Sequence, residues 1–315
     1  MSGAAEEKVE KQSGAAENSC ASCGIAGGDD FVLKNCTACY LAKYCSVKCQ
    51  KEHRPKHKKE CKRRAAELRD ELLFKQPESS HLGDCPICCL PLSLDVQKST
   101  LMSCCSTMIC QGCSLADNIR ELQRNFEHKC PFCRHILPRG AEESKMLIMK
   151  RVEANDPVAM TQRGLFCTDE GDYKSTFEYW TKAAKLGDIN AHYFLSNLYQ
   201  LGQGVEKDKK KRDFHLEEAA IGGHPTARHN LGSYENDERG CRERAVKHFI
   251  ISAKLGYDGS LENLKHLYKQ GAVSREDFAE ALRGHKAAVD ATKSPQRKEA
   301  EEYAEFASKY EKEGC

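Results

Sequence analysis

Residues 20–61 are the most informative part of the sequence and read CASCGIAGGDDFVLKNCTACYLAKYCSVKCQKEHRPKHKKEC. Cysteine and histidine recur in it as four pairs, and two or three other residues separate the members of each pair. Zinc takes four such ligands in a tetrahedron, so eight ligands predict two closed metal sites that serve structure rather than catalysis. The predicted ligands are Cys20, Cys23, Cys36, Cys39, Cys45, Cys49, His57 and Cys61.

One further histidine lies within this stretch and competes as a ligand. His57 is separated from Cys61 by three residues, a spacing that places two ligands on one face of a helical turn. His53 does not have this spacing. We therefore expect His57 to bind metal and His53 to be solvent-exposed or packed.

The eight-ligand pattern resembles the MYND finger over its full length, most closely at residues 44–50 and 57–61. The resemblance implies two zinc ions bound by interleaved pairs. One ion would be held by Cys20, Cys23, Cys45 and Cys49. The other would be held by Cys36, Cys39, His57 and Cys61. The resemblance also implies docking of short peptides that often contain proline.

The chain around the end of this finger is strongly basic. Between Lys43 and Arg69 there are eleven lysines or arginines and three acidic residues. Such a segment can bind nucleic acid or an acidic partner, or act as a nuclear import signal. We favour a solvated helix whose charge partly balances the metal-bound thiolates, so a nucleic-acid partner is not the preferred interpretation.

A second cysteine cluster follows at residues 85–133 and resembles a RING finger, a family that also uses two interleaved zinc sites. The resemblance assigns the first site to Cys85, Cys88, Cys110 and Cys113. The second site would contain Cys105, Cys130 and Cys133, but Thr107 stands where the family places histidine. Because buried thiolates without metal are costly, we expect Cys104, or failing that His128, to complete it. This finger then binds one or two zinc ions, and Cys89 is expected to pack.

The RING resemblance raises the question of ubiquitin ligase activity. RING ligases bind a ubiquitin-conjugating enzyme and orient its thioester for attack, without covalent chemistry of their own. By resemblance, Ile87 and Pro131 would contact the conjugating enzyme, and Arg134 would hydrogen-bond across to ubiquitin. The irregular second site argues against this activity and favours a finger that only binds proteins.

The second half of the chain contains an internal repeat. An alanine-containing segment ending in glycine occurs three times, at Gly187, Gly223 and Gly256, in steps of 36 and 33 residues. A period near 34 residues is typical of paired amphipathic helices in a solenoid, with glycine at helix C-caps where φ is positive. We expect the apolar residues in each copy to fill the interfaces between helices; these are Trp180, Leu216 and Phe249.

The repeat resembles the Sel-type repeat, a relative of the tetratricopeptide repeat, most closely at residues 195–208 and at Ala219–Ala220. That family implies a protein-binding scaffold. The Gly202-Gln203-Gly204 loop lacks the preceding strand of a nucleotide fingerprint, so we interpret it as structural. We find no independent catalytic motif in the chain.

Cysteine usage separates the front of the chain from the back. Sixteen of the 19 cysteines lie between Cys20 and Cys133. The N-terminus carries no secretory signal, and no apolar run reaches the length of a membrane span. We therefore expect an intracellular protein of the cytoplasm, the nucleus or both, without a membrane partner, where disulfides are rare and cysteines bind metal.

Together these patterns predict two small zinc-stabilised domains followed by an all-α helical-repeat solenoid. The expected parts are a disordered N-terminus (1–19), a MYND-type finger (20–61), a basic helix and linker (62–84), a RING-like finger (85–135), Sel-like repeats (141–286) and a charged C-terminal helix or tail (287–315). The predicted function is an intracellular adaptor for proteins or peptides. The alternative is a RING-type ubiquitin ligase that recruits substrate through the MYND finger and repeats.

Overall fold

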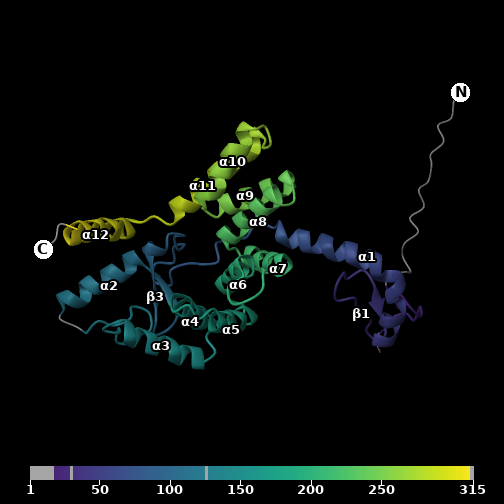
Figure 1. The fold of residues 1–315 in the computed structure, drawn as a ribbon, viewed down its shortest axis with the longest axis horizontal. Coiled ribbons are helices and arrows are strands. Elements are labelled where there is room, and N and C mark those ends of the chain that lie inside the picture. Colours follow the sequence, from purple (N-terminus) through teal and green to yellow (C-terminus); the bar gives the residue numbers. More distant parts are fainter. Residues whose placement is uncertain (1–17, 29–30, 125–126, 313–315) are drawn as a thin grey trace. The chain divides into compact units, whose positions relative to one another are not determined.

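The structure is a computed structural model that describes residues 18–28, 31–124 and 127–312 (Figure 1). Most of the predicted disordered segment 1–19, namely residues 1–17, lies outside the described residues, as do residues 313–315. The chain divides into two compact units, Met1–Leu73 and Phe74–Cys315. Each unit is described by itself below.

The first unit is a two-stranded hairpin followed by one long helix. Strands β1 (Lys34–Asn35) and β2 (Lys43–Tyr44) pair antiparallel, with Lys34 opposite Tyr44. Helix α1 (Val47–Leu73) begins within the finger, and its end provides the basic helix expected after residue 61. The buried core is small and consists mainly of thiols; its members are Cys20, Leu33, Cys36, Cys39, Ala42, Tyr44 and Cys49.

The second unit begins with the other cysteine-rich module. A 3-10 turn, η1 (Val96–Lys98), leads into the antiparallel hairpin β3 (Ser99–Met102) and β4 (Thr107–Cys110), in which Met102 lies opposite Thr107. Helix α2 (Gln111–Gln123) follows directly. Leu92, Met102 and Ile109 are the buried non-cysteine residues of this core.

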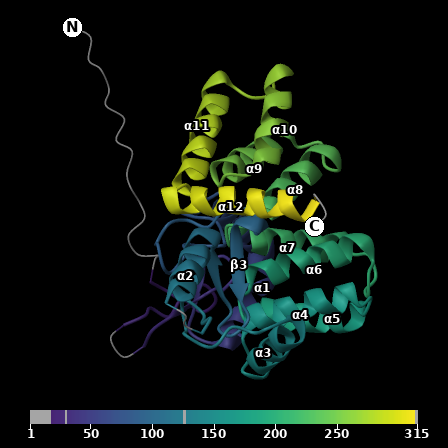
Figure 2. The same ribbon diagram turned by 90° about the vertical axis from the view of Figure 1, so that its left-hand side faces the viewer.

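The rest of the second unit is helical. Helix α3 (Ala141–Glu153) precedes three helical pairs, and within each pair the two helices make extensive contact (Figure 2). The pairs are α4 (Pro157–Asp169) with α5 (Tyr173–Lys185), α6 (Ile189–Leu201) with α7 (Lys209–Ile221), and α8 (Pro225–Asp237) with α9 (Arg242–Lys254). Helices α10 (Asp258–Lys269) and α11 (Arg275–Ala291) then pack on α9.

The ends of these helices explain the repeat seen in the sequence. The three repeated glycines have φ values of 93°, 86° and 91° at Gly187, Gly223 and Gly256. This left-handed backbone is easy for glycine, as a helix C-terminus requires, so the predicted C-caps are confirmed. The predicted fold class, two small cysteine-rich modules followed by an all-α repeat, is also confirmed.

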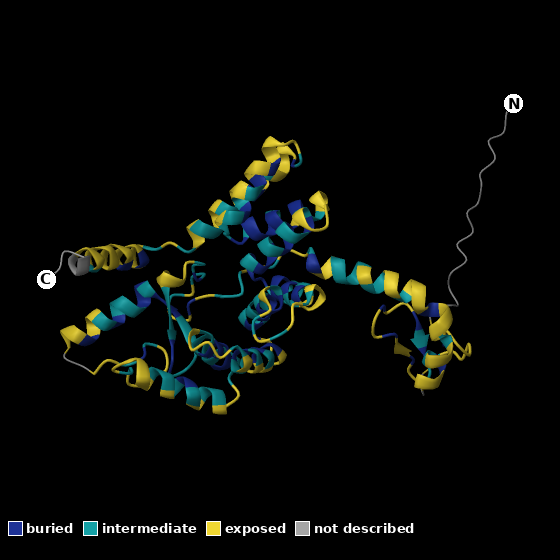
Figure 3. Cartoon of the chain, in the orientation of Figure 1, coloured by how far each residue is buried: buried dark blue, intermediate teal, exposed yellow. Residues whose placement is uncertain are grey.

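The interfaces between paired helices are filled as the repeat predicts. Buried and exposed residues alternate along the helices of the array (Figure 3). Trp180, Leu216 and Phe249 occupy the eighth position of α5, α7 and α9 and are all buried. Two of them lie against a glycine of the preceding helix. A Cβ added to Gly164 would lie 2.2 Å from Nε1 of Trp180, and one added to Gly232 would lie 2.7 Å from the Phe249 ring. Small residues at these positions let the helices approach closely.

The segment after residue 73 lies against the helical array. The centroid of the Phe74 ring is 4.8 Å from that of His248, and the Arg244 guanidinium lies over the Phe74 ring, also 4.8 Å from its centroid. Further along, His81 stacks on His224 at 4.1 Å, and its backbone N–H donates to the carbonyl of Gly223 at 3.0 Å. The predicted linker is therefore bound to the repeats through aromatic stacking.

The His81–His224 stack predicts a pH dependence of stability. Burial lowers the pKa of His81 to about 4, and it lowers the pKa of His224 well below its usual value of 6.5. The unfolded chain therefore binds more protons between pH 4 and 6.5, so stability is full above pH 6.5 and falls as the pH drops toward 4. Each histidine can lower the free energy of unfolding by up to about 1.4 kcal/mol for each unit of falling pH in this range.

This dependence can be measured by denaturant unfolding followed through Trp180, the only tryptophan in the chain. His81→Asn should make the loss of stability with falling pH shallower, because one titrating group is removed. A free energy of unfolding that stays constant or rises between pH 6.5 and 4 would contradict the assignment.

The predicted C-terminal tail is the helix α12 (Pro295–Lys312), which packs on α2 (Figures 1 and 2). Most of its described side chains are exposed, but Arg297 and Ala300 are buried. An ion pair of 2.9 Å joins Lys98 and Glu301. No helix among residues 18–28, 31–124 and 127–312 has the length and apolar character needed to cross a membrane.

Candidate metal centres

Four short turns in the two fingers share one backbone geometry. Each begins at the first cysteine of a C-x2-C pair, namely Cys20, Cys36, Cys85 and Cys130. The carbonyl of that cysteine accepts a hydrogen bond of 2.8 to 2.9 Å from the backbone N–H four residues later. The residue that donates this bond has a positive φ in every case; these residues are Gly24, Tyr40, Cys89 and Arg134.

This geometry explains the placement of Cys89, which was expected to pack. Cys89 has a φ of 56° and is exposed, outside all four groups of clustered donors. The backbone N–H of Cys89 completes the turn, whereas its side chain is exposed. The expectation of a packed thiol is therefore wrong.

The sixteen predicted ligands come together as four groups of four, with the donor atoms of each group within 4.8 Å of one another. In each finger the first pair in the chain joins the third, and the second joins the fourth. The groups are Cys20, Cys23, Cys45 and Cys49; Cys36, Cys39, His57 and Cys61; Cys85, Cys88, Cys110 and Cys113; and Cys104, Cys105, Cys130 and Cys133.

Helix α1 supplies ligands to both centres of the first finger. Cys49 lies in its first turn, and its Sγ is 3.4 Å from that of Cys45. His57 and Cys61 follow on the same helix: His57 Nε2 is 3.1 Å from Cys39 Sγ, and the Cys61 and Cys36 sulfurs are 3.7 Å apart. A single helix thus ties the two centres together.

His53, the competing candidate, lies outside both centres. Its Nδ1 is 3.1 Å from the Tyr44 hydroxyl, and its ring stacks on that of His57 at a centroid distance of 5.6 Å. The buried Tyr44 therefore holds His53 in a packing role, and His57 alone supplies an imidazole donor to the second centre.

In the second finger, the structure groups Cys104 rather than His128 with the three other thiols of the irregular centre. Cys104 Sγ is 3.4 Å from Cys133 Sγ, and Cys105 Sγ is 3.9 Å from Cys130 Sγ. His128 is half-exposed and faces Glu121, with 3.6 Å between Nδ1 and Oε2. Thr107 is the first residue of β4 and bonds through Oγ1 to the Cys105 carbonyl.

These donor sets fit zinc. In a tetrahedron with Zn–S bonds of about 2.3 Å, neighbouring sulfurs are about 3.8 Å apart. Sulfur–sulfur distances in the four centres are 3.4 to 3.9 Å. Each centre has four sulfur or nitrogen donors, which is the closed arrangement of structural zinc.

Electrostatics within a centre also favours a cation. The backbone amide of Cys23 lowers the pKa of the Cys20 thiol to about 6. In the same centre, hydrogen bonds with the thiols of Cys49 and Cys23 raise the pKa of Cys45 to about 12. One sulfur thus ionises readily while another keeps its proton. A divalent ion is what would allow all four to be thiolates at neutral pH.

The three positions assigned to a conjugating enzyme lie around the two centres of the second finger. Ile87 is 42 % exposed, between the ligands Cys85 and Cys88. Pro131 is partly buried, and the exposed Arg134 is ion-paired with Asp117 of α2 at 3.5 Å.

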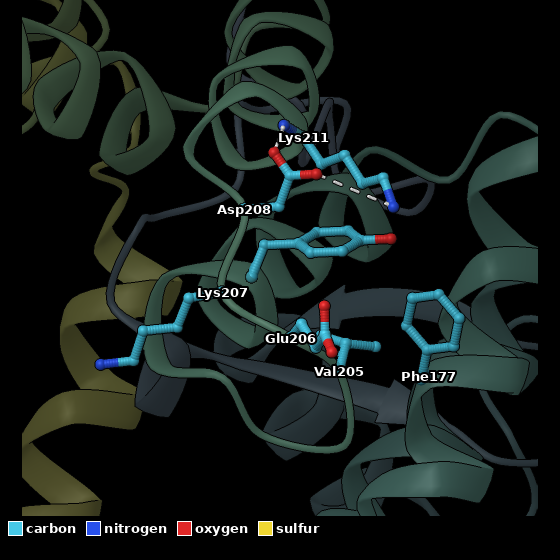
Figure 4. Close-up of a pocket in the computed structure, with 7 residues that line it drawn as sticks. Phe177, Val205, Glu206, Lys207, Asp208 and Lys211 are labelled. Carbon is cyan, nitrogen blue, oxygen red and sulfur yellow. Dashed lines mark hydrogen bonds and ion pairs between the residues drawn. The ribbon is translucent and has the colours of Figure 1, made fainter.

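A cavity in the array lies beside the Gly202–Gly204 loop (Figure 4). Its volume is about 380 Å³, and it is lined by Phe177, Tyr199, Val205, Glu206, Lys207, Asp208 and Lys211. A Cβ on Gly204 would lie 2.6 Å from the Tyr173 carbonyl oxygen, so close backbone approach requires this glycine. This close approach agrees with the structural interpretation of the Gly-x-Gly loop.

Comparison with known proteins identifies the first finger. Residues 20–61 match the family model of the MYND finger. This match implies zinc in the first finger. No curated protein gives a significant match to the chain.

Solved structures resemble part of the chain. A Sel1 repeat protein from Oxalobacter formigenes is 28 % identical over 49 % of this chain and 66 % of its own, with a TM-score of 0.43. The protein c5321, a protective antigen of uropathogenic Escherichia coli with an SLR fold, is 19 % identical over 53 % of this chain and 37 % of its own, with a TM-score of 0.39. The chain spans less than two thirds of either structure.

Proposed function

We propose that the chain is an adaptor in which zinc shapes the two fingers, the MYND finger docks peptides and the helical array holds a second protein partner. Four closed centres, each with four donors, support a structural role for four zinc ions. The paired helices of the array support a scaffolding role, because stacked repeats present a continuous surface.

The observation that carries peptide docking is the apolar surface of the first finger. Although this module is small and its core is mainly cysteine, its described residues expose six large apolar side chains. Contiguous exposed apolar surface marks sites of protein interaction, and these side chains include two pairs of sequence neighbours, Phe31–Val32 and Tyr40–Leu41. The six residues are Ile25 (55 % exposed), Phe31 (38 %), Val32 (81 %), Tyr40 (63 %), Leu41 (53 %) and Val47 (66 %).

A displayed peptide library selected on the zinc-loaded chain tests this proposal. Val32→Asp and Tyr40→Asp should weaken binding of the selected peptides about 30-fold, since an interface hot spot is worth about 2 kcal/mol. Val96→Asp is the matched control, because Val96 is 84 % exposed but lies in the second unit. Equal binding by all three variants, or binding that survives zinc removal, would overturn the proposal.

The alternative function is a RING-type ubiquitin ligase, and the exposure of Ile87 favours it. If the second finger recruits a conjugating enzyme, auto-ubiquitination with a panel of these enzymes should be detectable. It should be lost in Ile87→Ala and kept in Val96→Ala. If no conjugating enzyme supports auto-ubiquitination of a chain that has bound its zinc, the ligase function is excluded and the adaptor function remains.

A further inference from the structure

The C-terminal helix places one arginine against the first metal centre of the second finger. Arg297 lies in the first turn of α12 and is only 8 % exposed. Its Nη2 donates to Cys88 Sγ at 3.3 Å and to the Leu90 carbonyl at 3.0 Å. Its Nη1 donates to the carbonyls of Pro91 at 2.6 Å and Thr292 at 2.7 Å. One guanidinium thus joins residues about two hundred positions apart.

The packing around Arg297 is shaped to bring it there. A Cβ added to Gly112, at the start of α2, would lie 3.0 Å from the backbone nitrogen and Cα of Arg297. Ser294 caps the arginine's own N–H at 3.2 Å, which fixes the start of the helix. The ion pair between Lys98 and Glu301 connects the next turn of α12 to the second finger. The contact with Cys88 is therefore part of a close interface rather than a loose surface bond.

The charges at this interface explain why a cation is buried there. Cys88 is grouped with Cys85, Cys110 and Cys113, and its Sγ is 3.8 Å from that of Cys110. A zinc ion with four thiolates has a net charge of about −2 by ligand counting. A hydrogen bond from a cation offsets part of that charge and holds the ligand in place, as groups outside a metal centre commonly do.

We propose that Arg297 stabilises the zinc-bound thiolate of Cys88, so that metal binding at this centre and docking of α12 on the finger stabilise each other. Coupling of this kind is reciprocal: what the docked helix adds to metal retention, the metal adds to helix docking. The C-terminal helix is then a part of the second finger supplied from the far end of the chain. The inference requires zinc at this centre but is independent of which partner the adaptor binds.

The test compares Arg297→Met with Glu301→Gln in the zinc-loaded full chain. Arg297→Met removes the charge and the donors to Cys88. Glu301→Gln weakens the same helix interface without touching a thiol. The rate at which N-ethylmaleimide modifies each cysteine is measured by peptide mass spectrometry, which resolves the four centres separately.

Arg297→Met should accelerate modification of one centre about 10- to 100-fold, the usual effect of removing a partner that supports a metal ligand. The affected cysteines should be Cys85, Cys88, Cys110 and Cys113. The other three centres should not change, and Glu301→Gln should have a much smaller effect. No acceleration, or equal acceleration in all four centres, would overturn the proposal.

A spectroscopic readout separates this role from simple packing. In the cobalt-loaded chain, loss of the donor to Cys88 should shift part of the thiolate-to-metal charge-transfer band to lower energy in Arg297→Met but not in Glu301→Gln. If Arg297→Met loses a metal ion, cysteine modification shows which centre is empty. Loss from the Cys88 centre supports the proposal, and loss from another centre overturns it.

Discussion

Removal of zinc by a strong chelator is expected to unfold the first finger while the helical array keeps its structure. The first finger has three buried apolar residues besides cysteine, namely Leu33, Ala42 and Tyr44. The array core around Trp180 and Leu195 is built from apolar side chains instead. A structural zinc site contributes about 10–16 kcal/mol of apparent binding free energy, which in such modules is folding free energy.

Native mass spectrometry should find four zinc ions, and hydrogen exchange should show loss of protection in residues 20–61 after chelation. Three ions would mean that the Cys104 centre is empty. No ions would refute the zinc assignment altogether. The fluorescence of Trp180 should be unchanged by chelation, because this residue lies in the array.

Two adjacent cysteines provide a matched pair for the same experiment. Cys88→Ser should lower the zinc count by one, because Cys88 belongs to a centre of four donors. Cys89→Ser should leave the count unchanged, because Cys89 is exposed and outside every centre. Equal counts in the two variants would contradict the assignment of ligands.

Trp180→Ala is expected to cause a large loss in the free energy of unfolding of the helical array. Trp180 is 4 % exposed, stacks on Phe194 at 4.9 Å and donates from Nε1 to the Thr161 carbonyl at 3.1 Å. Truncation leaves a cavity between α4, α5 and α6 and removes the indole hydrogen bond. Substitutions of this type cost about 3–5 kcal/mol, so the array should unfold at much lower denaturant concentration.

Phe214→Ala is the control for this prediction, because Phe214 is an aromatic residue of the same array that is 52 % exposed. Circular dichroism at 222 nm follows unfolding of both variants, since it reports helix content and needs no tryptophan. A Trp180→Ala chain as stable as Phe214→Ala would mean that the helical pairs do not depend on this interface.

The ligand pairs could be predicted from the sequence because their spacing is a local property. A C-x2-C pair fits one turn, and the four turns indeed share the same hydrogen bond. The choice between Cys104 and His128 could not be made in this way. Adjacent residues on a strand point to opposite faces, so Cys104 and Cys105 are an unusual pair of ligands.

The hairpin resolves this difficulty. Cys104 and Cys105 lie in the turn between β3 and β4, where Ser106 has a φ of 55° and donates to the Met102 carbonyl at 2.8 Å. The turn can direct both sulfurs to one centre. Likewise, no spacing rule connects Arg297 with Cys88, because that contact depends on how α12 packs.

The interleaving of the pairs has a consequence for synthesis of the protein. Because the first pair of each finger shares a centre with the third, no centre is complete until most of its finger has been made. The centre of Cys20 and Cys23 is complete only after Cys49 has been synthesised, and the centre of Cys85 and Cys88 only after Cys113. At about 5–20 residues per second, each nascent finger exposes reactive thiols for seconds. The ribosome-bound chain is therefore most vulnerable to oxidation just before each finger closes.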